Sequence, residues 1–421
     1  MMAEGVTKST LKNGIRILTM RMPYIRSVSM GVWVNCGGRD ETAEENGLSH
    51  LIEHMIFKGT RRRSAYQIAK EFDAIGGQTN AFTSLENTCY HAKVMDTHLA
   101  PMVDVLSDIF LNSVFADDEL ERERPVILQE IGMVEDSPEE YIHVLNSSNF
   151  WNDHPLGRSI LGSRENVRRF DTAGLKRFFH RLYQPDRIVI SAAGNLNHEH
   201  FVDLVADNFS NIQPGTGFPE RIPPIAHNRT QIHPRDIEQV HLCLSATGVH
   251  ITDDRRFAFS LLNTILGGNM SSRLFQEIRE RRGLAYSVYS FSSSYVDSGV
   301  AGIYAGVDPA NAVETVRLIL AEIEKLKTNP VTEEELGGAK EFTRGSLLLS
   351  AESNENQMVR LAQSDIHFNR YVPIGEVTEK IDKVTVDDVT ELAETLFAGN
   401  RLGLTVLGPV DDSAKFRGIL K

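Results

Sequence analysis

The chain has 421 residues, enough for two or three domains of about 150 residues each. Hydrophobic residues make up 41% and charged residues 24%, which excludes a disordered, collagenous or disulfide-stapled chain and indicates a soluble folded protein. The 44 Lys and Arg against 57 Asp and Glu give a net charge of −13. That charge repels nucleic acid and anionic membranes, and it fits either a cationic partner or plain solubility.

Three cysteines, Cys36, Cys89 and Cys243, are widely spaced and odd in number, so we expect buried free thiols rather than disulfides or a thiolate metal site. The first thirty residues lack an apolar stretch as long as a secretory signal needs, and no later stretch is long enough to span a membrane. We therefore expect a cytoplasmic protein, unless a presequence has been removed.

Strands and helices alternate in blocks along the first half of the chain. Asn13-Gly14 between two apolar runs predicts a hairpin, and Gly76-Gly77 predicts the end of a helix. Pro125 marks a kink or a break between two helices. In chain order we expect strands at 27–35, 78–84 and 87–94, and helices at about 46–57, 64–77, 97–111 and 117–134. Such grouping predicts an α+β fold in which a mainly antiparallel sheet packs with helices.

Two similar domains are expected from an internal repeat. Four of the 15 prolines lie between Ile212 and Thr230, a density that prevents helix and predicts a linker. RIVISAAGNL at Arg187 matches RLGLTVLGPV at Arg401 at an offset of 214, and two further pairs match at 212 and 216. We therefore predict a first domain at 1–212, a linker at 213–230 and a second domain at 231–421.

The motif that carries chemistry is H-x-x-E-H, formed by His50, Glu53 and His54. On a helix, His50 and His54 share a face and can bind one metal ion, and Glu53 beside them can serve as a general base. Hydrogen-bonded core histidines are the alternative explanation. Glu123 and Glu130 stand seven apart, so they share a helix face if the helix continues past Pro125, although they could equally form a solvated face.

With Glu130 lying 76 residues after His54, the sequence resembles the inverzincin metallopeptidases of the pitrilysin and insulinase clan. It is most similar to the mitochondrial processing peptidase branch and its bacterial relatives, through GLSHLIEHMIFKGT, GGQTNAFTSLENTCY, ERPVILQEI and LGGNMSSRLFQEIRERRGLAYSV. The resemblance covers nearly the whole chain. It implies one zinc ion per chain held by His50, His54 and Glu130, with Glu53 as base and Glu123 orienting a ligand.

The same resemblance assigns a different role to the second domain. It implies that Arg279 and Tyr286, seven apart in RERRGLAY, bind substrate, Arg279 holding a carbonyl and Tyr286 the developing oxyanion. A solvated helix charge and a strand-face aromatic are the alternatives. At an offset of 212, the metal motif falls on the apolar residues Leu262, Ile265 and Leu266, so we expect no zinc in that domain.

The resemblance further implies that the strand from Gly77 to Thr83 aligns substrate. Asn80 and Ala81 are candidates for binding an extended peptide through their backbone, which requires that the strand lie at a sheet edge rather than inside the sheet.

Together these features predict a zinc endopeptidase that cleaves extended or unfolded, presequence-like or basic peptides inside a chamber. A non-catalytic scaffold subunit of the same fold and a zinc hydrolase of a small molecule are the alternatives. Apart from the peptide substrate we expect a homodimer, or else a monomer, with no nucleic acid or membrane partner.

Overall fold

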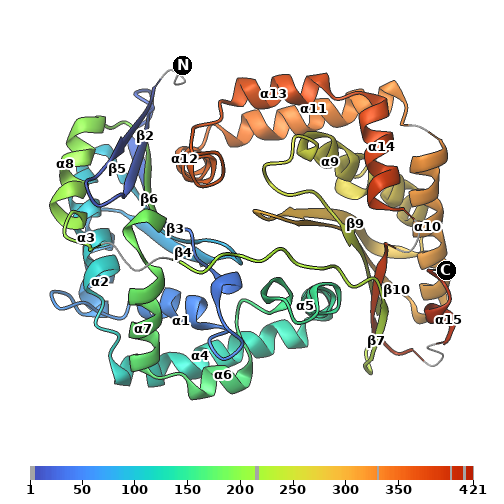
Figure 1. The fold of residues 1–421 in the computed structure, drawn as a ribbon, viewed down its shortest axis with the longest axis horizontal. Coiled ribbons are helices and arrows are strands. Elements are labelled where there is room, and N and C mark those ends of the chain that lie inside the picture. The colour runs from blue at the N-terminus through green and yellow to red at the C-terminus, as the bar shows by residue number, and fades with distance from the viewer. Residues whose placement is uncertain (1–4, 214–217, 330, 399–400, 411–413, 421) are drawn as a thin grey trace. The chain divides into compact units, whose positions relative to one another are not determined.

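The computed structural model describes residues 5–213, 218–329, 331–398, 401–410 and 414–420 (Figure 1). The chain forms two compact units, each with one sheet packed against helices, which confirms the α+β class. Unit 1 comprises Met1–Gly132, Arg158–Arg221 and Leu349–Pro373; unit 2 comprises Met133–Gly157, Ile222–Leu348 and Ile374–Lys421.

The sheet of unit 1 has six strands in the order β1-β2-β6-β3-β5-β4, and among its pairs only β2 and β6 run parallel. The expected hairpin joins β1 to β2, where Gly14 has a φ of 99° that favours glycine. The central strand β3 is buried over nearly its whole length, as both faces of the sheet are covered. The strands are β1 (Val6–Thr10), β2 (Arg16–Arg21), β3 (Ser27–Val34), β4 (Gln78–Thr83), β5 (Thr88–Met95) and β6 (Ile188–Gly194).

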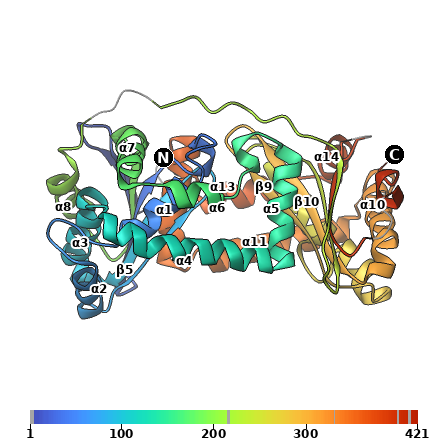
Figure 2. The same ribbon diagram turned by 90° about the horizontal axis from the view of Figure 1, so that it is seen from below.

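Helix α4 has 20 residues with Pro125 inside it, so the break expected there does not occur. Figure 2 shows α4 as one continuous helix. Its last four residues belong to unit 2. Unit 1 also contains short 3₁₀ turns, η1 (Gly38–Asp40), η2 (Asp96–His98) and η4 (Pro185–Arg187). Its helices are α1 (Leu48–Met55), α2 (Ala65–Ala74), α3 (Leu99–Asn112), α4 (Asp117–Asp136), α6 (Arg164–Arg169), α7 (Thr172–Leu182), α8 (His198–Phe209) and α12 (Asn354–Phe368).

Unit 2 has a five-stranded sheet in the order β7-β11-β8-β10-β9, in which only β7 and β11 pair in parallel. Its strands are β7 (Thr230–Pro234), β8 (Val240–Thr247), β9 (Ala285–Ser294), β10 (Gly299–Val307) and β11 (Gly403–Gly408). Its helical elements are α5 (Pro138–Trp151), η3 (Pro155–Gly157), α9 (Arg256–Asn263), the π-helical turns η5 (Thr264–Gly268) and η6 (Phe275–Arg281), η7 (Pro309–Asn311), α10 (Ala312–Thr328), most of α11 (Glu333–Ser350), α13 (Ile374–Lys383), α14 (Val386–Leu396) and α15 (Ala414–Arg417).

The two sheets repeat one topology. Without β1, the order β2-β6-β3-β5-β4 corresponds strand for strand to β7-β11-β8-β10-β9, and each has its parallel pair in the same place. Gly194 and Gly408 end the corresponding strands β6 and β11 with φ values of 144° and 145°. A Cβ at either glycine would collide with the backbone of the neighbouring strand, near Val28 and Val240 respectively. The offsets found in the sequence therefore reflect repeated backbone geometry.

The compact units differ from the continuous domains 1–212 and 231–421 expected from the sequence, because two helices are exchanged. Helix α5, from the first half, packs on β8 and β11, whereas α12, from the second half, packs on β2, β3 and β6. Asp365 on α12 is fully buried and pairs with Lys8 at 2.5 Å and with Arg16 at 3.3 Å. Each sheet is thus covered on one face by a helix from the other half of the sequence.

The proline-rich segment is partly anchored; its residues 214–217 lie outside the described ranges. Arg221 donates to both carboxylate oxygens of Asp40 at 2.8 Å and to the carbonyl of Glu86 at 2.9 Å. The guanidinium of Arg187 stacks on the ring of Phe218, 3.4 Å from its centroid. These contacts bind residues 218–221 to unit 1.

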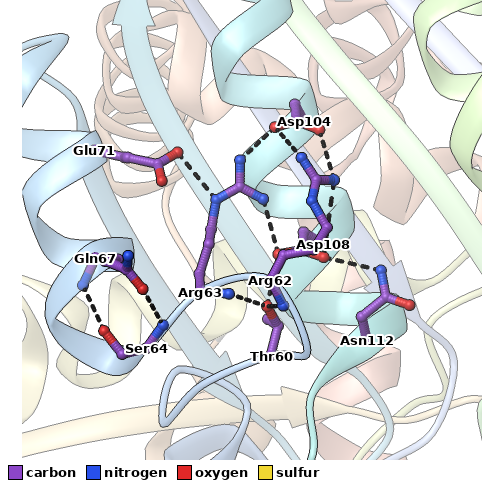
Figure 3. Close-up of polar contacts among 9 residues, drawn as sticks. All are labelled: Thr60, Arg62, Arg63, Ser64, Gln67, Glu71, Asp104, Asp108 and Asn112. Carbon is purple, nitrogen blue, oxygen red and sulfur yellow. Dashed lines mark hydrogen bonds and ion pairs between the residues drawn. The ribbon is translucent and has the colours of Figure 1, made fainter.

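Figure 3 shows a cluster of ion pairs that fixes the segment after α1 in unit 1. The buried Arg63 donates to Asp108 at 2.8 Å and to Glu71 at 3.0 Å and also pairs with Asp104, which ties the segment to α2 and α3. The three cysteines are free and buried, as expected. Within the described ranges, no helix is long and apolar enough to cross a membrane.

Candidate active site

Helix α1 of unit 1 contains both histidines of the motif, and close backbone packing and hydrogen bonds fix its first turn. Gly47 precedes it with a φ of 107°, and a Cβ there would lie 2.9 Å from Cα of Gly162. The buried carboxylate of Glu41 accepts the backbone N–H groups of Gly47 at 2.8 Å and Ser49 at 2.7 Å, which are otherwise unsatisfied at a helix start. Burial raises the pKa of Glu41 to about 7, although these hydrogen bonds oppose the shift.

The structure brings His50, His54 and Glu130 together. Nε2 of His50 lies 3.5 Å and Nε2 of His54 lies 3.6 Å from Oε2 of Glu130, and one donor atom from each residue lies within 4.8 Å of the others. Glu130 reaches the site because α4 continues past Pro125. These three residues are the only such cluster of His, Cys, Asp and Glu among the described residues, so the expected ligand set converges.

The donor set fits a zinc ion. Nδ1 of His54 contacts Glu123 at 3.2 Å, and Lys58 pairs with the other oxygen of Glu123 at 2.5 Å, so that the anionic carboxylate holds a proton on Nδ1 and leaves Nε2 free. Burial, and after it His54, lowers the pKa of His50 to about 4, which keeps its imidazole neutral at pH 7. Two imidazoles and one carboxylate with an open fourth position are the usual ligands of catalytic zinc.

Glu53 lies beside this cluster and outside the converging donor group. Its Oε2 is shielded from solvent and has no hydrogen-bond partner. Burial raises the pKa of Glu53 above its usual value, while hydrogen bonding from Thr83 on β4 opposes the shift. A carboxylate with an uncommitted oxygen and a raised pKa is suited to proton transfer.

The strand β4 forms one edge of the sheet in unit 1, since it pairs only with β5 among the described strands. Asn80 is exposed and Ala81 is half-buried. The backbone N–H of Ala81 donates to Oδ1 of Asn80 at 2.9 Å instead of remaining free. The edge position required for adding a peptide strand is therefore present, and the internal-strand alternative is wrong.

Arg279 and Tyr286 lie together in unit 2, on η6 and β9. The guanidinium carbon of Arg279 lies 4.9 Å from the ring centroid of Tyr286 and 4.8 Å from that of Phe275. Tyr286 is 80% exposed. The stacking orients the guanidinium against an open aromatic side chain, and both residues line a groove of about 310 Å³. Arg279 thus stacks on two aromatic rings, and the ring of Tyr286 remains open to solvent.

Comparison with known proteins decides the family. The chain is 41% identical over 395 residues to the Bacillus subtilis protein named uncharacterized zinc protease YmxG, covering 93% of this chain and 96% of the relative. It belongs to the insulinase family of peptidases, M16. The model of the Insulinase (Peptidase family M16) domain matches residues 16–164 of this M16 chain, and that of the Peptidase M16 inactive domain matches residues 169–342.

Other relatives of this M16 chain agree. It is 38% identical over 420 residues to a Streptomyces coelicolor protein also named an uncharacterized zinc protease, covering 98% of this chain and 91% of the relative. Its fold matches a protease from Helicobacter pylori with a TM-score of 0.90 at 21% identity, covering 96% of this chain and 99% of that one.

Unit 2 of the M16 chain lacks a comparable metal cluster among its described residues. Leu262, Ile265 and Leu266 are buried, as expected from their apolar character. The sequence interpretation missed Glu41, Lys58 and Thr83. Of these three, only Lys58 could have been noticed, because it lies four residues after His54 in the sequence.

Proposed function

We propose that this chain is a zinc-dependent endopeptidase that cleaves extended or unfolded polypeptides. The observation that carries the proposal is the convergence of His50, His54 and Glu130 next to Glu53, whose free oxygen has no other partner. Relatives named as zinc proteases support the choice of metal, and we propose one zinc ion per chain.

The residues of the chain have separate tasks in the proposed reaction. Zinc, when bound, supplies a Lewis acid that polarises water and the peptide carbonyl. Glu53 accepts the proton of the attacking water and passes it to the leaving amine, a task for which its raised pKa is suited. Glu123 keeps His54 in the tautomer that presents Nε2.

Substrate binding is assigned to backbone and side chains of both units. A peptide added to the edge strand β4 gains main-chain hydrogen bonds at Asn80 and Ala81 that hardly depend on its sequence. Arg279 is proposed to hold a substrate carbonyl, and the exposed Tyr286 to stabilise the developing oxyanion. An extended backbone is therefore the main requirement for a substrate.

The finer assignments concern specificity and assembly. We propose a preference for basic, presequence-like peptides, because the net charge of −13 attracts cations. One chain contains both the candidate metal ligands and Arg279 with Tyr286, so a homodimer or a monomer suffices. Sedimentation at micromolar concentration distinguishes these states.

The deciding experiment is a peptide-library digest read by mass spectrometry, with Glu53→Gln as the blank. We expect chelator-sensitive cleavage, and a loss of rate of at least about 100-fold in Glu53→Gln with zinc retained at one ion per chain. Wild-type rates in Glu53→Gln would refute the mechanism. Absence of both stoichiometric zinc and cleavage would favour a scaffold subunit, and zinc without cleavage of peptides would favour a hydrolase of small molecules.

A further inference from the structure

A cavity of about 670 Å³ lies in unit 2 between η5, the residues that follow it and helix α11. Ile265 and Met270 line it from one wall, and Gly338, Ala339 and Phe342 from the other. It is about twice the size of the groove beside Arg279, and its volume is in the range of natural ligand pockets.

The cavity lies between the two helical elements of unit 2 that correspond, in the repeated topology, to the helices that carry the metal cluster in unit 1. In the repeated topology, α9 and η5 follow the central strand β8 as α1 follows β3, and α11 follows α10 as α4 follows α3. In unit 1 these helices bring His50, His54 and Glu130 together. At the offsets of 212 and 216, the lining residues Ile265 and Ala339 correspond to Glu53 and Glu123, which flank that cluster. Apolar residues of the cavity wall thus stand where unit 1 has the two acidic residues beside its metal cluster.

Two apolar side chains of the cavity lining are open to solvent. Met270 is 74% exposed and Phe342 is 48% exposed, so a ligand that buries these two side chains would gain hydrophobic contact. A Cβ at Gly338 would meet nothing within 4 Å, so its neighbours do not require glycine. Glycine destabilises a helix interior relative to alanine, and here it keeps the wall of the cavity open.

Charge further limits the occupant. Glu335 is held by Arg273 through contacts of 2.8 and 2.9 Å that join the two walls. None of the described residues that line the cavity is Lys, Arg or His, so an anionic ligand finds no counter-charge. The lining also contains polar residues and a second carboxylate, Glu334, so a neutral apolar group fits only the part of the cavity formed by Ile265, Met270, Ala339 and Phe342.

The cavity adjoins the groove of Arg279 and Tyr286, since Asn269 and Met270 line both. A peptide held at Arg279 and Tyr286 can therefore place a neighbouring side chain past Met270. A large apolar side chain there would bury the exposed surfaces of Met270 and Phe342.

We propose that this cavity is a subsite for a large apolar side chain, that of Phe, Leu or Met, of the peptide substrate. The proposal rests on the proposed peptidase function and deepens it. It adds a preference for an apolar side chain to a substrate that is otherwise recognised through its backbone.

The test uses Gly338→Leu, which fills the cavity at a position where a side chain meets no neighbour. Gly337→Leu is the matched control: it also lies in α11 with open space at its Cβ but does not line the cavity. A cleaved peptide is rebuilt with alanine away from the scissile bond, and one phenylalanine is moved through those positions. KM is measured for each peptide with wild type and both variants.

We expect one position at which phenylalanine lowers KM about tenfold in wild type and in Gly337→Leu, with no such gain in Gly338→Leu. The all-alanine peptide should be cleaved within twofold by all three proteins. No gain at any position, or an equal gain in Gly338→Leu, would overturn the proposal.

Fluorescence anisotropy separates the subsite from catalysis. The labelled phenylalanine and alanine peptides are titrated into zinc-loaded Glu53→Gln protein with and without Gly338→Leu. Tighter binding of the phenylalanine peptide that Gly338→Leu removes supports the subsite even if no peptide is cleaved. Equal binding of the two peptides refutes it even if cleavage occurs.

Discussion

The carboxylate of Glu41 accepts the backbone N–H of Ser49 at 2.7 Å, directly before the first candidate zinc ligand. Nδ1 of His50 has no hydrogen-bond partner, whereas Nδ1 of His54 is held by Glu123. The position of His50 therefore depends on the backbone of α1, which Glu41 fixes at its first turn.

The buried carboxyl of Glu41 is expected to make the free energy of unfolding depend on pH. Its pKa of about 7 in the folded state lies above the ordinary 4.5. Between these values the folded state binds more protons at this group than the unfolded state does, so its contribution to the free energy of unfolding falls as pH rises. The fall amounts to about 3 kcal/mol across that window.

Urea unfolding at pH 4.5 and 7.5, with a chelator present, measures the effect by comparing wild type with Glu41→Gln. The variant should lack this part of the pH dependence, and at pH 4.5, where the folded-state carboxyl is itself protonated, it should lie within about 1 kcal/mol of wild type. The exposed Glu352→Gln should behave as wild type. Parallel pH profiles for Glu41→Gln and wild type would contradict the assignment.

Glu123 is expected to control zinc affinity without binding the ion. Glu123→Gln removes the anion that orients His54 and leaves Lys58 without its partner, so affinity should fall about 10- to 100-fold. Lys58→Met keeps the contact between Glu123 and His54, so its zinc affinity should fall by less than that of Glu123→Gln. Competition with a chromophoric chelator at pH 7.5 measures both, and unchanged affinity in Glu123→Gln would exclude the role.

Arg63 should stabilise unit 1 far more than its neighbour Arg62 does. Arg63→Met would remove the close cation, at 2.8 Å, of Asp108, whose side chain is fully buried, and leave only Arg62 at 4.0 Å, at a cost of about 3 kcal/mol. Arg62, 54% exposed, also pairs with Asp104, and Arg62→Met should cost less than about 1 kcal/mol. Equal midpoints of urea unfolding for the two variants would contradict this difference.

The edge strand β4 should bind substrate through its backbone at Ala81. Ala81→Pro removes the N–H that now donates to Asn80, and we expect KM to rise about tenfold with zinc content unchanged. Asn80→Ala instead releases that N–H and should leave KM equal or lower. Steady-state kinetics on one peptide separate the two; equal KM values would argue against strand addition.

Local pattern predicted the elements well because each depends on nearby residues. Pro125 is the exception: it removes a helical hydrogen bond, yet α4 continues. The position is exposed, so water can satisfy the carbonyl that loses its donor, and Leu120 and Ile127 hold the helix by burial on either side. This continuity places Glu123 and Glu130 on one face, which the sequence left open.

The contacts that hold the candidate zinc site and its sheet in place could not be predicted from the sequence, and the reason is different. Glu41 acts over eight residues through backbone N–H groups, which have no sequence signature. The exchange of α5 and α12 depends on contacts between residues more than a hundred positions apart, such as Asn354 with Ser27 at 3.2 Å. Periodicity indicates that such helices have an apolar face, but it does not indicate which sheet receives it.

Because α12 belongs to unit 1 but comes late in the sequence, unit 1 cannot finish folding until most of the chain has been synthesised. The candidate zinc ligands are made by residue 130, but α12, which covers their sheet, ends at Phe368. At ribosomal speeds the intervening 368 − 130 = 238 residues take on the order of ten to fifty seconds. For that time Trp33 and its apolar neighbours lack Met358 and Leu361 as packing partners. Translation order therefore sets the earliest moment at which the metal-binding unit can become rigid.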